Sequence, residues 1–202
     1  MSRPLRIGIY PGVFDPVHAG HIGFALQALK QANLDRIYFM PERRPWHKSG
    51  VEHFGHRVAM LSRACRPYKA FEVLEVDDIK FTMERTVPKL QQAFTGSQLV
   101  YLFGSDVALK LPAWRNVEQL LTSSELVVGV RAGDDPRAVA QCIRSWPSQP
   151  LDLHVFESYA ADVSSSKVRE ALRAQRYVHG LLTSVARYSN RNWLYISLAD
   201  NT

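Results

Sequence analysis

The sequence predicts one α/β domain, built on an open, mostly parallel sheet with helices on both faces. Short aliphatic, β-branched and aromatic runs alternate with segments of helical period along the chain. Such alternation is typical of parallel sheets with right-handed crossovers. The 202 residues, 46% of them hydrophobic, are enough to bury one sizeable core, and no repeat or linker divides them. We therefore expect a single domain over residues 1–202.

Six strands are expected where the apolar runs fall. The first leads into a turn rich in Gly, Pro and Asp, and each of the others is followed by a polar or helical stretch. The predicted strands are residues 5–10, 36–40, 71–76, 98–103, 125–130 and 151–156.

Helices are expected between the strands. In the first, Ile22, Leu26 and Leu29 recur at the spacing of one helix face. Another begins at Thr86 with Pro88 in its first turn, where proline is tolerated. The polar stretch 41–54 is broken by Pro and Gly, so we expect a long loop there. The remaining helices are predicted near 58–65, 134–146, 164–173 and 181–189.

The charge balance predicts an anionic partner. The chain has a net charge of +6 and an isoelectric point of about 9.5. That balance suits nucleotides, nucleic acids or membrane surfaces. The basic residues are scattered and form no stripe with interleaved aromatics, so phosphate-bearing small molecules are favoured and nucleic acid is not expected.

The compartment is predicted from two further observations. No apolar run approaches the ~18 residues that a membrane span needs, and no signal peptide is recognisable, so no membrane partner is expected. Cys65 and Cys142 are too few for a disulfide framework and are not spaced as a metal site. A reducing cytoplasm is the expected location.

The turn after the first strand carries the first candidate site. In open parallel sheets, ligands bind beyond the carboxyl ends of strands, where turns meet helix N-termini. Gly12 lets the backbone approach a ligand, and Gly20 removes bulk at the helix start. His18 and His21 would then face one bound anion. Two alternatives stay open: a metal on the histidines, for which no third ligand stands nearby, and histidines that only cap or pack.

A second helix N-terminus, near the end of the chain, offers similar chemistry. Ser164, Ser165 and Ser166 precede a helical segment, and Arg169 stands one turn further on. Their hydroxyls and the free N–H groups suit phosphate. Serines are also ordinary N-caps, and the arginine could lie on a solvated face. Together the two motifs predict that both ends of the chain converge on one polyphosphate.

The stretch GVFDPVHAGH, residues 12–21, resembles the HxGH signature of the nucleotidyltransferase superfamily. DVSSSKVR, residues 162–169, resembles its second phosphate motif. With further matches at 103–114, 128–133 and 185–195, the chain is most similar to nicotinate/nicotinamide mononucleotide adenylyltransferases. The resemblance implies a Rossmann-like fold whose C-terminal helices, about 164–195, complete the ATP site. It also implies AMP transfer from ATP to a pyridine mononucleotide in NAD biosynthesis.

The resemblance implies roles for particular residues. ATP and a phosphorylated small-molecule acceptor become the partners, with Mg²⁺ carried by the substrate and no metal site on the protein. Trp114 is expected to stack on the cationic pyridine ring. The implied catalytic residues are His18, His21 and Arg169; the ATP-binding residues are Gly12, Phe14, Gly20, Lys48, Gly104, Asp106, Ser164, Ser165 and Ser166; the acceptor-binding residues are Thr86, Trp114 and Arg131.

Three positions depart from the family pattern. Pro11 stands where Gly is usual, Val13 replaces Thr or Ser, and Arg85 replaces a Tyr beside the acceptor. These changes spare the phosphate motifs and leave the acceptor open between the acid mononucleotide, the amide mononucleotide and another phosphorylated compound. A non-catalytic nucleotide sensor and a homo-oligomer also stay open.

Overall fold

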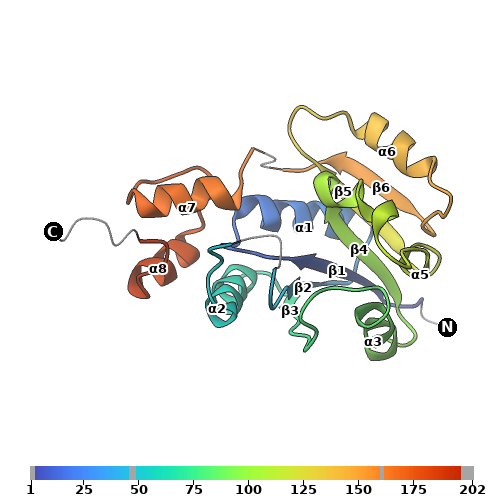
Figure 1. The fold of residues 1–202 in the computed structure, drawn as a ribbon, viewed down its shortest axis with the longest axis horizontal. Helices are drawn as coiled ribbons and strands as arrows, with labels where there is room; N and C mark the ends of the chain where they lie inside the picture. Colours follow the sequence, from blue (N-terminus) through green and yellow to red (C-terminus); the bar gives the residue numbers. More distant parts are fainter. Residues whose placement is uncertain (1–2, 46–48, 160–161, 197–202) are drawn as a thin grey trace.

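The computed structural model describes residues 3–45, 49–159 and 162–196. Its centre is a six-stranded sheet in the order β3-β2-β1-β4-β5-β6, with every neighbouring pair parallel (Figure 1). The strand order reverses between β1 and β4, which is where open parallel sheets bind ligands. The strands are β1 (Arg6–Gly12), β2 (Arg36–Pro41), β3 (Phe71–Val73), β4 (Gln98–Gly104), β5 (Glu125–Val130) and β6 (Leu153–Glu157).

All six predicted strands are present, and the predicted fold class is confirmed. The main difference is β3, which ends at Val73 although apolar residues continue to residue 76. It is an edge strand that pairs only with β2, and its last link to the sheet is the bond from the Leu74 N–H to the Phe39 carbonyl. With no partner on its other side, the chain leaves the sheet early.

Six helices match the predicted ones, and three short ones between β4 and β5 were not predicted. Pro112, which has no backbone N–H, lies within this stretch and prevents one continuous helix. The predicted helices are α1 (Ala19–Gln31), α2 (Phe54–Cys65), α3 (Thr86–Ala93), α6 (Pro136–Arg144), α7 (Ser165–Arg173) and α8 (Thr183–Arg191). The additional ones are α4 (Ser105–Ala108), the 3₁₀-helix η1 (Leu111–Ala113) and α5 (Glu118–Leu121).

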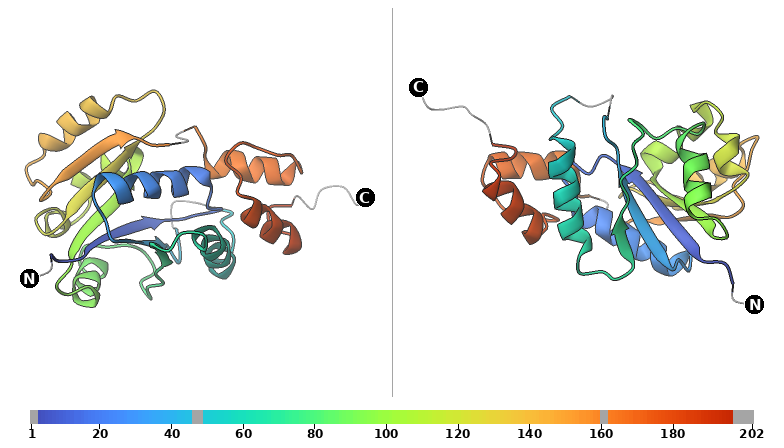
Figure 2. Two further views of the ribbon diagram at one scale, coloured as in Figure 1. Left: turned by 180° about the vertical axis from the view of Figure 1, so that it is seen from behind. Right: turned by 90° about the horizontal axis from the view of Figure 1, so that it is seen from below.

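Helices cover both faces of the sheet, as the alternation predicts. Successive residues of β4 point to opposite cores: Val100 and Leu102 pack with α1, α2, α7 and α8, whereas Tyr101 and Phe103 pack with α3 to α6. The views of Figure 2 place α7 and α8 together at the end of the sheet away from α3 and α5. None of the helices in the described part of the chain is long and apolar enough to cross a membrane.

The approach of α1 to the sheet depends on Gly129 in β5. A Cβ there would lie 2.7 Å from ring carbons of Phe24. We expect Gly129→Ala to lower the free energy of unfolding by ~1–3 kcal/mol, because an overpacked core must shift. Gly55→Ala is the control: its Cβ would lie 3.6 Å from the His53 ring, and alanine favours a helix by ~0.5–1 kcal/mol over glycine. Urea denaturation measures both, and an unchanged midpoint for Gly129→Ala would contradict the packing argument.

Candidate nucleotide-binding site

The turn between β1 and α1 is shaped by a buried phenylalanine. Phe14 has a φ of 50° and is 2% exposed. Its ring fills the space beside Gly12, where a Cβ would lie 2.9 Å from the ring. A glycine is therefore needed at position 12 to leave room for the Phe14 ring. The sequence did not reveal this packing role. Contact of Gly12 or Phe14 with ATP stays a prediction.

The two imidazoles lie side by side where α1 begins. The ring centroids of His18 and His21 are 3.7 Å apart, and the His18 backbone N–H donates to Nδ1 of His21 at 3.2 Å. Because Nδ1 of His21 accepts, its Nε2 is the nitrogen that carries a proton. Gly20, between them, is buried in the first turn of α1. The predicted pairing of the histidines on one side of the helix start is therefore present.

His18 is held in the neutral form. Its side chain is buried, and burial, with a smaller contribution from the nearby Arg131 cation, lowers its pKa to about 4. Its Nδ1 is buried and has no hydrogen-bond partner among the described residues. A buried polar atom without a partner is costly in a finished core but is expected where a ligand binds. His18 at neutral pH is therefore a hydrogen-bond donor or acceptor rather than a cation.

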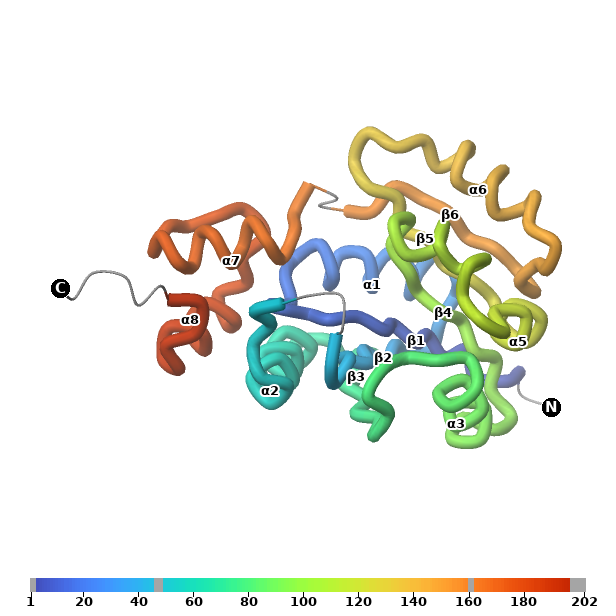
Figure 3. Tube along the Cα trace, viewed as in Figure 1, coloured from blue at the N-terminus to red at the C-terminus, as the bar shows by residue number. Residues whose placement is uncertain are grey.

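The N-terminus of α7 docks against this same turn. Arg169 donates from Nη1 to the Asp15 carbonyl at 2.6 Å, and the Ser165 hydroxyl donates to the Pro16 carbonyl at 3.1 Å. These contacts join segments about 150 residues apart, and Figure 3 shows the start of α1 beside α7. The histidine turn near the start of the chain and the serine–arginine motif near its end do come together.

The three serines have structural bonds in the structure. The Ser164 hydroxyl accepts from the Lys167 N–H as the N-cap of α7, and the Ser166 hydroxyl accepts from Nη2 of Arg169 at 3.2 Å. The alternative interpretation of the serines as capping residues thus holds for Ser164. Phosphate contact by any of the three stays a prediction.

A carboxylate–guanidinium pair lies at the carboxyl ends of β4 and β5. Nη2 of Arg131 donates to Oδ2 of Asp106 at 2.9 Å, and both side chains are at least half exposed. A Cβ on Gly104 would lie 2.7 Å from Oδ1 of Asp106, so glycine makes room for that carboxylate. Arg131 also acts electrostatically on His18. Arg131 is predicted to bind the acceptor, but the residues that it interacts with, Asp106 and His18, are predicted to bind ATP.

The other predicted acceptor residues lie in the core over the opposite face. Thr86 is fully buried; its hydroxyl donates to Asp78 and accepts from the Thr82 N–H. Trp114 is half-buried, with ring centroids of Phe81 and Phe103 at 6.2 and 6.3 Å. A direct contact of the Thr86 hydroxyl with an acceptor stays a prediction, as does stacking on Trp114. Lys48 lies outside the described residues.

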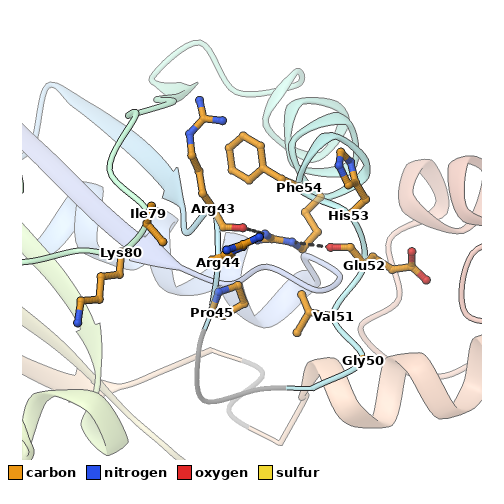
Figure 4. A pocket seen from close by; sticks show the side chains of 11 residues that line it. Arg43, Arg44, Pro45, Gly50, Val51, Glu52, His53, Phe54, Ile79 and Lys80 are labelled. Carbon is orange, nitrogen blue, oxygen red and sulfur yellow. Dashed lines mark hydrogen bonds between the residues drawn. The ribbon is translucent and has the colours of Figure 1, made fainter.

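Two further residues contact this turn: Arg57, to which the sequence assigned no role, and Tyr195, which appeared in it only as the end of the run 185–195. Tyr195 donates its hydroxyl to Oδ1 of Asp15 at 2.6 Å, and burial together with that carboxylate raises its pKa, so the phenol stays protonated. Arg57, in α2, donates to the Val13 carbonyl at 2.7 Å. Arg57 also lines a pocket of about 870 Å³ beside the turn, shared with Arg43, Arg44 and Lys80 (Figure 4). A histidine, serine or glycine pattern could not reveal either residue.

Among the described residues, one group of three side chains has metal-ligand geometry, and it lies elsewhere. Glu125, Asp152 and His154 stand at the amino ends of β5 and β6, opposite the turn that carries His18. Both carboxylate oxygens of Glu125 are bound by Arg6, at 2.8 and 2.6 Å. This group is therefore not the place where a metal would meet a phosphate at His18.

The comparisons with known proteins agree with the geometry. The model of the cytidylyltransferase-like family matches residues 9–171. Nicotinate-nucleotide adenylyltransferase of Bacillus subtilis is 32% identical over 95% of this chain and 99% of its own length. A probable nicotinate-nucleotide adenylyltransferase of Desulfitobacterium hafniense is 30% identical over 96% and 97% of the two chains.

A solved structure extends the likeness to the fold. Plasmodium falciparum nicotinic acid mononucleotide adenylyltransferase, complexed with NaAD, superposes with a TM-score of 0.76 at 17% identity, covering 95% of this chain and 97% of that one. The family model covers residues 9–171, and the relatives at 30% identity or more cover 95% and 96% of the chain. This chain belongs to the cytidylyltransferase-like family and, within it, to the nicotinate-nucleotide adenylyltransferases.

Proposed function

We propose that this protein transfers AMP from ATP to the 5′-phosphate of nicotinate mononucleotide, forming nicotinate adenine dinucleotide and pyrophosphate in NAD biosynthesis. The observation that carries the proposal is the pairing of His21 with the neutral, buried His18 at the start of α1, directly beside the docked N-terminus of α7. The family membership and the names of the relatives support it.

The reaction needs positioning and charge stabilisation rather than a base. The acceptor phosphate oxygen is already an anion; it attacks the α-phosphorus of ATP, and the bond to the bridging oxygen of pyrophosphate breaks. Neutral His18 and the Nε2–H of His21 would donate to oxygens around the α-phosphate as negative charge builds there. Because the two donors are already fixed in place, they would stabilise the charge without the reorientation that water molecules would need.

Arg169 and the α7 N-terminus would hold the β- and γ-phosphates. The guanidinium is anchored to the Asp15 carbonyl and to Ser166 and still has other N–H donors. The positive end of α7 favours the same anion. A Mg²⁺ ion would be held mainly by triphosphate oxygens and water, which is usual for this ion, and would supply further neutralisation of the leaving group.

The acceptor would bind on the side of the site that holds Trp114. Trp114 offers an aromatic face for a positively charged pyridine, and Asp106 with Arg131 would border the nucleotide ribose and phosphates. We take the acid mononucleotide as acceptor because the relatives are named for it. We also place the reaction in the cytoplasm, where the free thiols of Cys65 and Cys142 stay reduced.

A pyrophosphate-release assay with ATP and Mg²⁺ tests the function. Nicotinate mononucleotide should support turnover, with the amide mononucleotide and phosphopantetheine as competing acceptors in parallel reactions. His18→Ala should lower kcat by ~10²–10³-fold, because one donor to the developing charge is lost. ATP binding without release for any acceptor would indicate a sensor instead, and near-normal turnover of His18→Ala would remove its assigned role.

The protonation state of His18 can be measured by NMR. With a pKa of about 4, its ring proton resonances should not shift between pH 8 and pH 5.5, whereas an unperturbed histidine titrates near pH ~6.5. Because unfolded His18 binds a proton below pH ~6.5, the folded state should lose stability as the pH falls from there toward 4. His18→Asn assigns the signal by its disappearance; a midpoint near 6.5 would show a solvated imidazole.

Arg169→Ala tests the contribution of α7. Loss of the guanidinium should reduce kcat/KM for ATP by ~10²-fold or more, since a preorganised cation beside the phosphates is removed. Arg173→Ala is the matched control, because Arg173 lies in the last turn of the same helix; its kcat/KM should stay within about two-fold of wild type. Equal losses in both variants would indicate destabilised α7 rather than a phosphate contact.

A further inference from the structure

Arg57 is a buried guanidinium with an unusual set of partners. It is 1% exposed and comes from the first turn of α2. All four of the hydrogen bonds described for it go to backbone carbonyls: Val13 at 2.7 Å, Glu42 at 2.7 Å, Arg43 at 3.1 Å and Glu52 at 3.0 Å.

Those carbonyls belong to three separate segments. Val13 is in the turn that leads to His18, Glu42 and Arg43 follow β2, and Glu52 precedes α2. A further bond, from the Glu42 N–H to the Gly12 carbonyl at 2.9 Å, joins two of these segments directly. One side chain thus fixes both ends of the connection between β2 and α2 against the first turn.

Simple packing does not account for an arginine at this position. Desolvation lowers the pKa of Arg57, although the nearby charges of Asp15 and Glu42 partly oppose that effect. An apolar side chain in such a place is often as stable as a buried charge. A guanidinium differs from every other side chain in its rigid planar set of donors, which can hold several carbonyls in one fixed arrangement.

The first turn is held from two sides. Arg57 binds the Val13 carbonyl from α2, and Arg169 binds the Asp15 carbonyl from α7. We infer that Arg57 is a positioning residue for triphosphate binding. It fixes the position of the turn that carries His18 and His21 relative to the segment after β2 that contains Arg43 and Arg44. The identity of the ligand rests on the proposed function, and the role inferred for Arg57 acts through the backbone carbonyls that it binds.

Arg57→Lys tests the inference, because lysine keeps the positive charge but lacks the planar set of N–H donors that binds several carbonyls. Calorimetric titration with ATP and Mg²⁺, well below the melting temperature, should show a Kd raised by at least ten-fold. Hydrogen exchange of peptides covering 12–18 and 49–53 should be faster than in wild type. Arg63→Lys is the control on the same helix: its guanidinium lies over the Tyr188 ring at 4.3 Å and binds only the Ala59 carbonyl among its described hydrogen bonds, so ATP affinity should stay within two-fold.

The inference would be overturned if the Arg57→Lys protein folds and binds ATP within two-fold of wild type. This holds even if its melting temperature is lower, because a purely structural role predicts lower stability with unchanged ATP affinity. If Arg57→Lys does not fold, exchange in the wild-type protein decides: ATP should slow peptides 12–18 and 49–53 together, and protection of 12–18 alone would overturn the inference. Because binding is read without turnover, failure of the proposed function appears separately, as absent pyrophosphate release by wild type.

Discussion

Docking of the C-terminal segment on the first turn is the constraint on which the site depends. Asp15 is at its centre: its carboxylate accepts from the Tyr195 hydroxyl, and its carbonyl accepts from Arg169. The side chain is 3% exposed, and a carboxylate so buried needs partners. The Glu52 N–H donates to Oδ1 at 3.4 Å. The Tyr195 hydroxyl, which also donates to Oδ1, and the Arg169 guanidinium, 3.8 Å from Oδ2, both come from more than 150 positions later in the chain. The histidine turn and the start of α7 are therefore brought together only once the last helices have packed.

The same packing determines which side chains of the candidate site are neutral and which carry a positive charge. Closing the turn buries His18 and keeps its imidazole neutral, so it contributes a directed dipole. Formal positive charge stays on guanidinium groups, which cannot lose their protons under physiological conditions. In the proposed reaction, the histidines would donate to α-phosphate oxygens, where negative charge builds, and guanidinium cations would hold the phosphates of the leaving group.

The sequence predicted what depends on local pattern. The strands followed from apolar runs, and the meeting of the HAGH turn with Ser164–Arg169 followed from the rule that ligands bind at helix N-termini beyond parallel strands. Arg57 was not predicted, because an arginine between His56 and Val58 in an amphipathic helix resembles a surface residue. Tyr195 was seen only as part of a terminal run. Burial and partners far along the chain decide both roles, and one sequence does not display either.

The predicted phosphate residues and the predicted acceptor residue Trp114 rest on different cores, one on each face of the sheet. The histidine turn packs with α1, α2, α7 and α8, whereas Trp114 belongs to the core of α3 to α6. On that second face, Glu84 accepts from Asn116 at 2.9 Å and pairs with Arg115 at 3.5 Å. These bonds tie the segment before Thr86 to the residues after Trp114. No described hydrogen bond links Arg85 to the first turn. We therefore expect the departure at Arg85 to affect the predicted acceptor residues and not the position of the histidines.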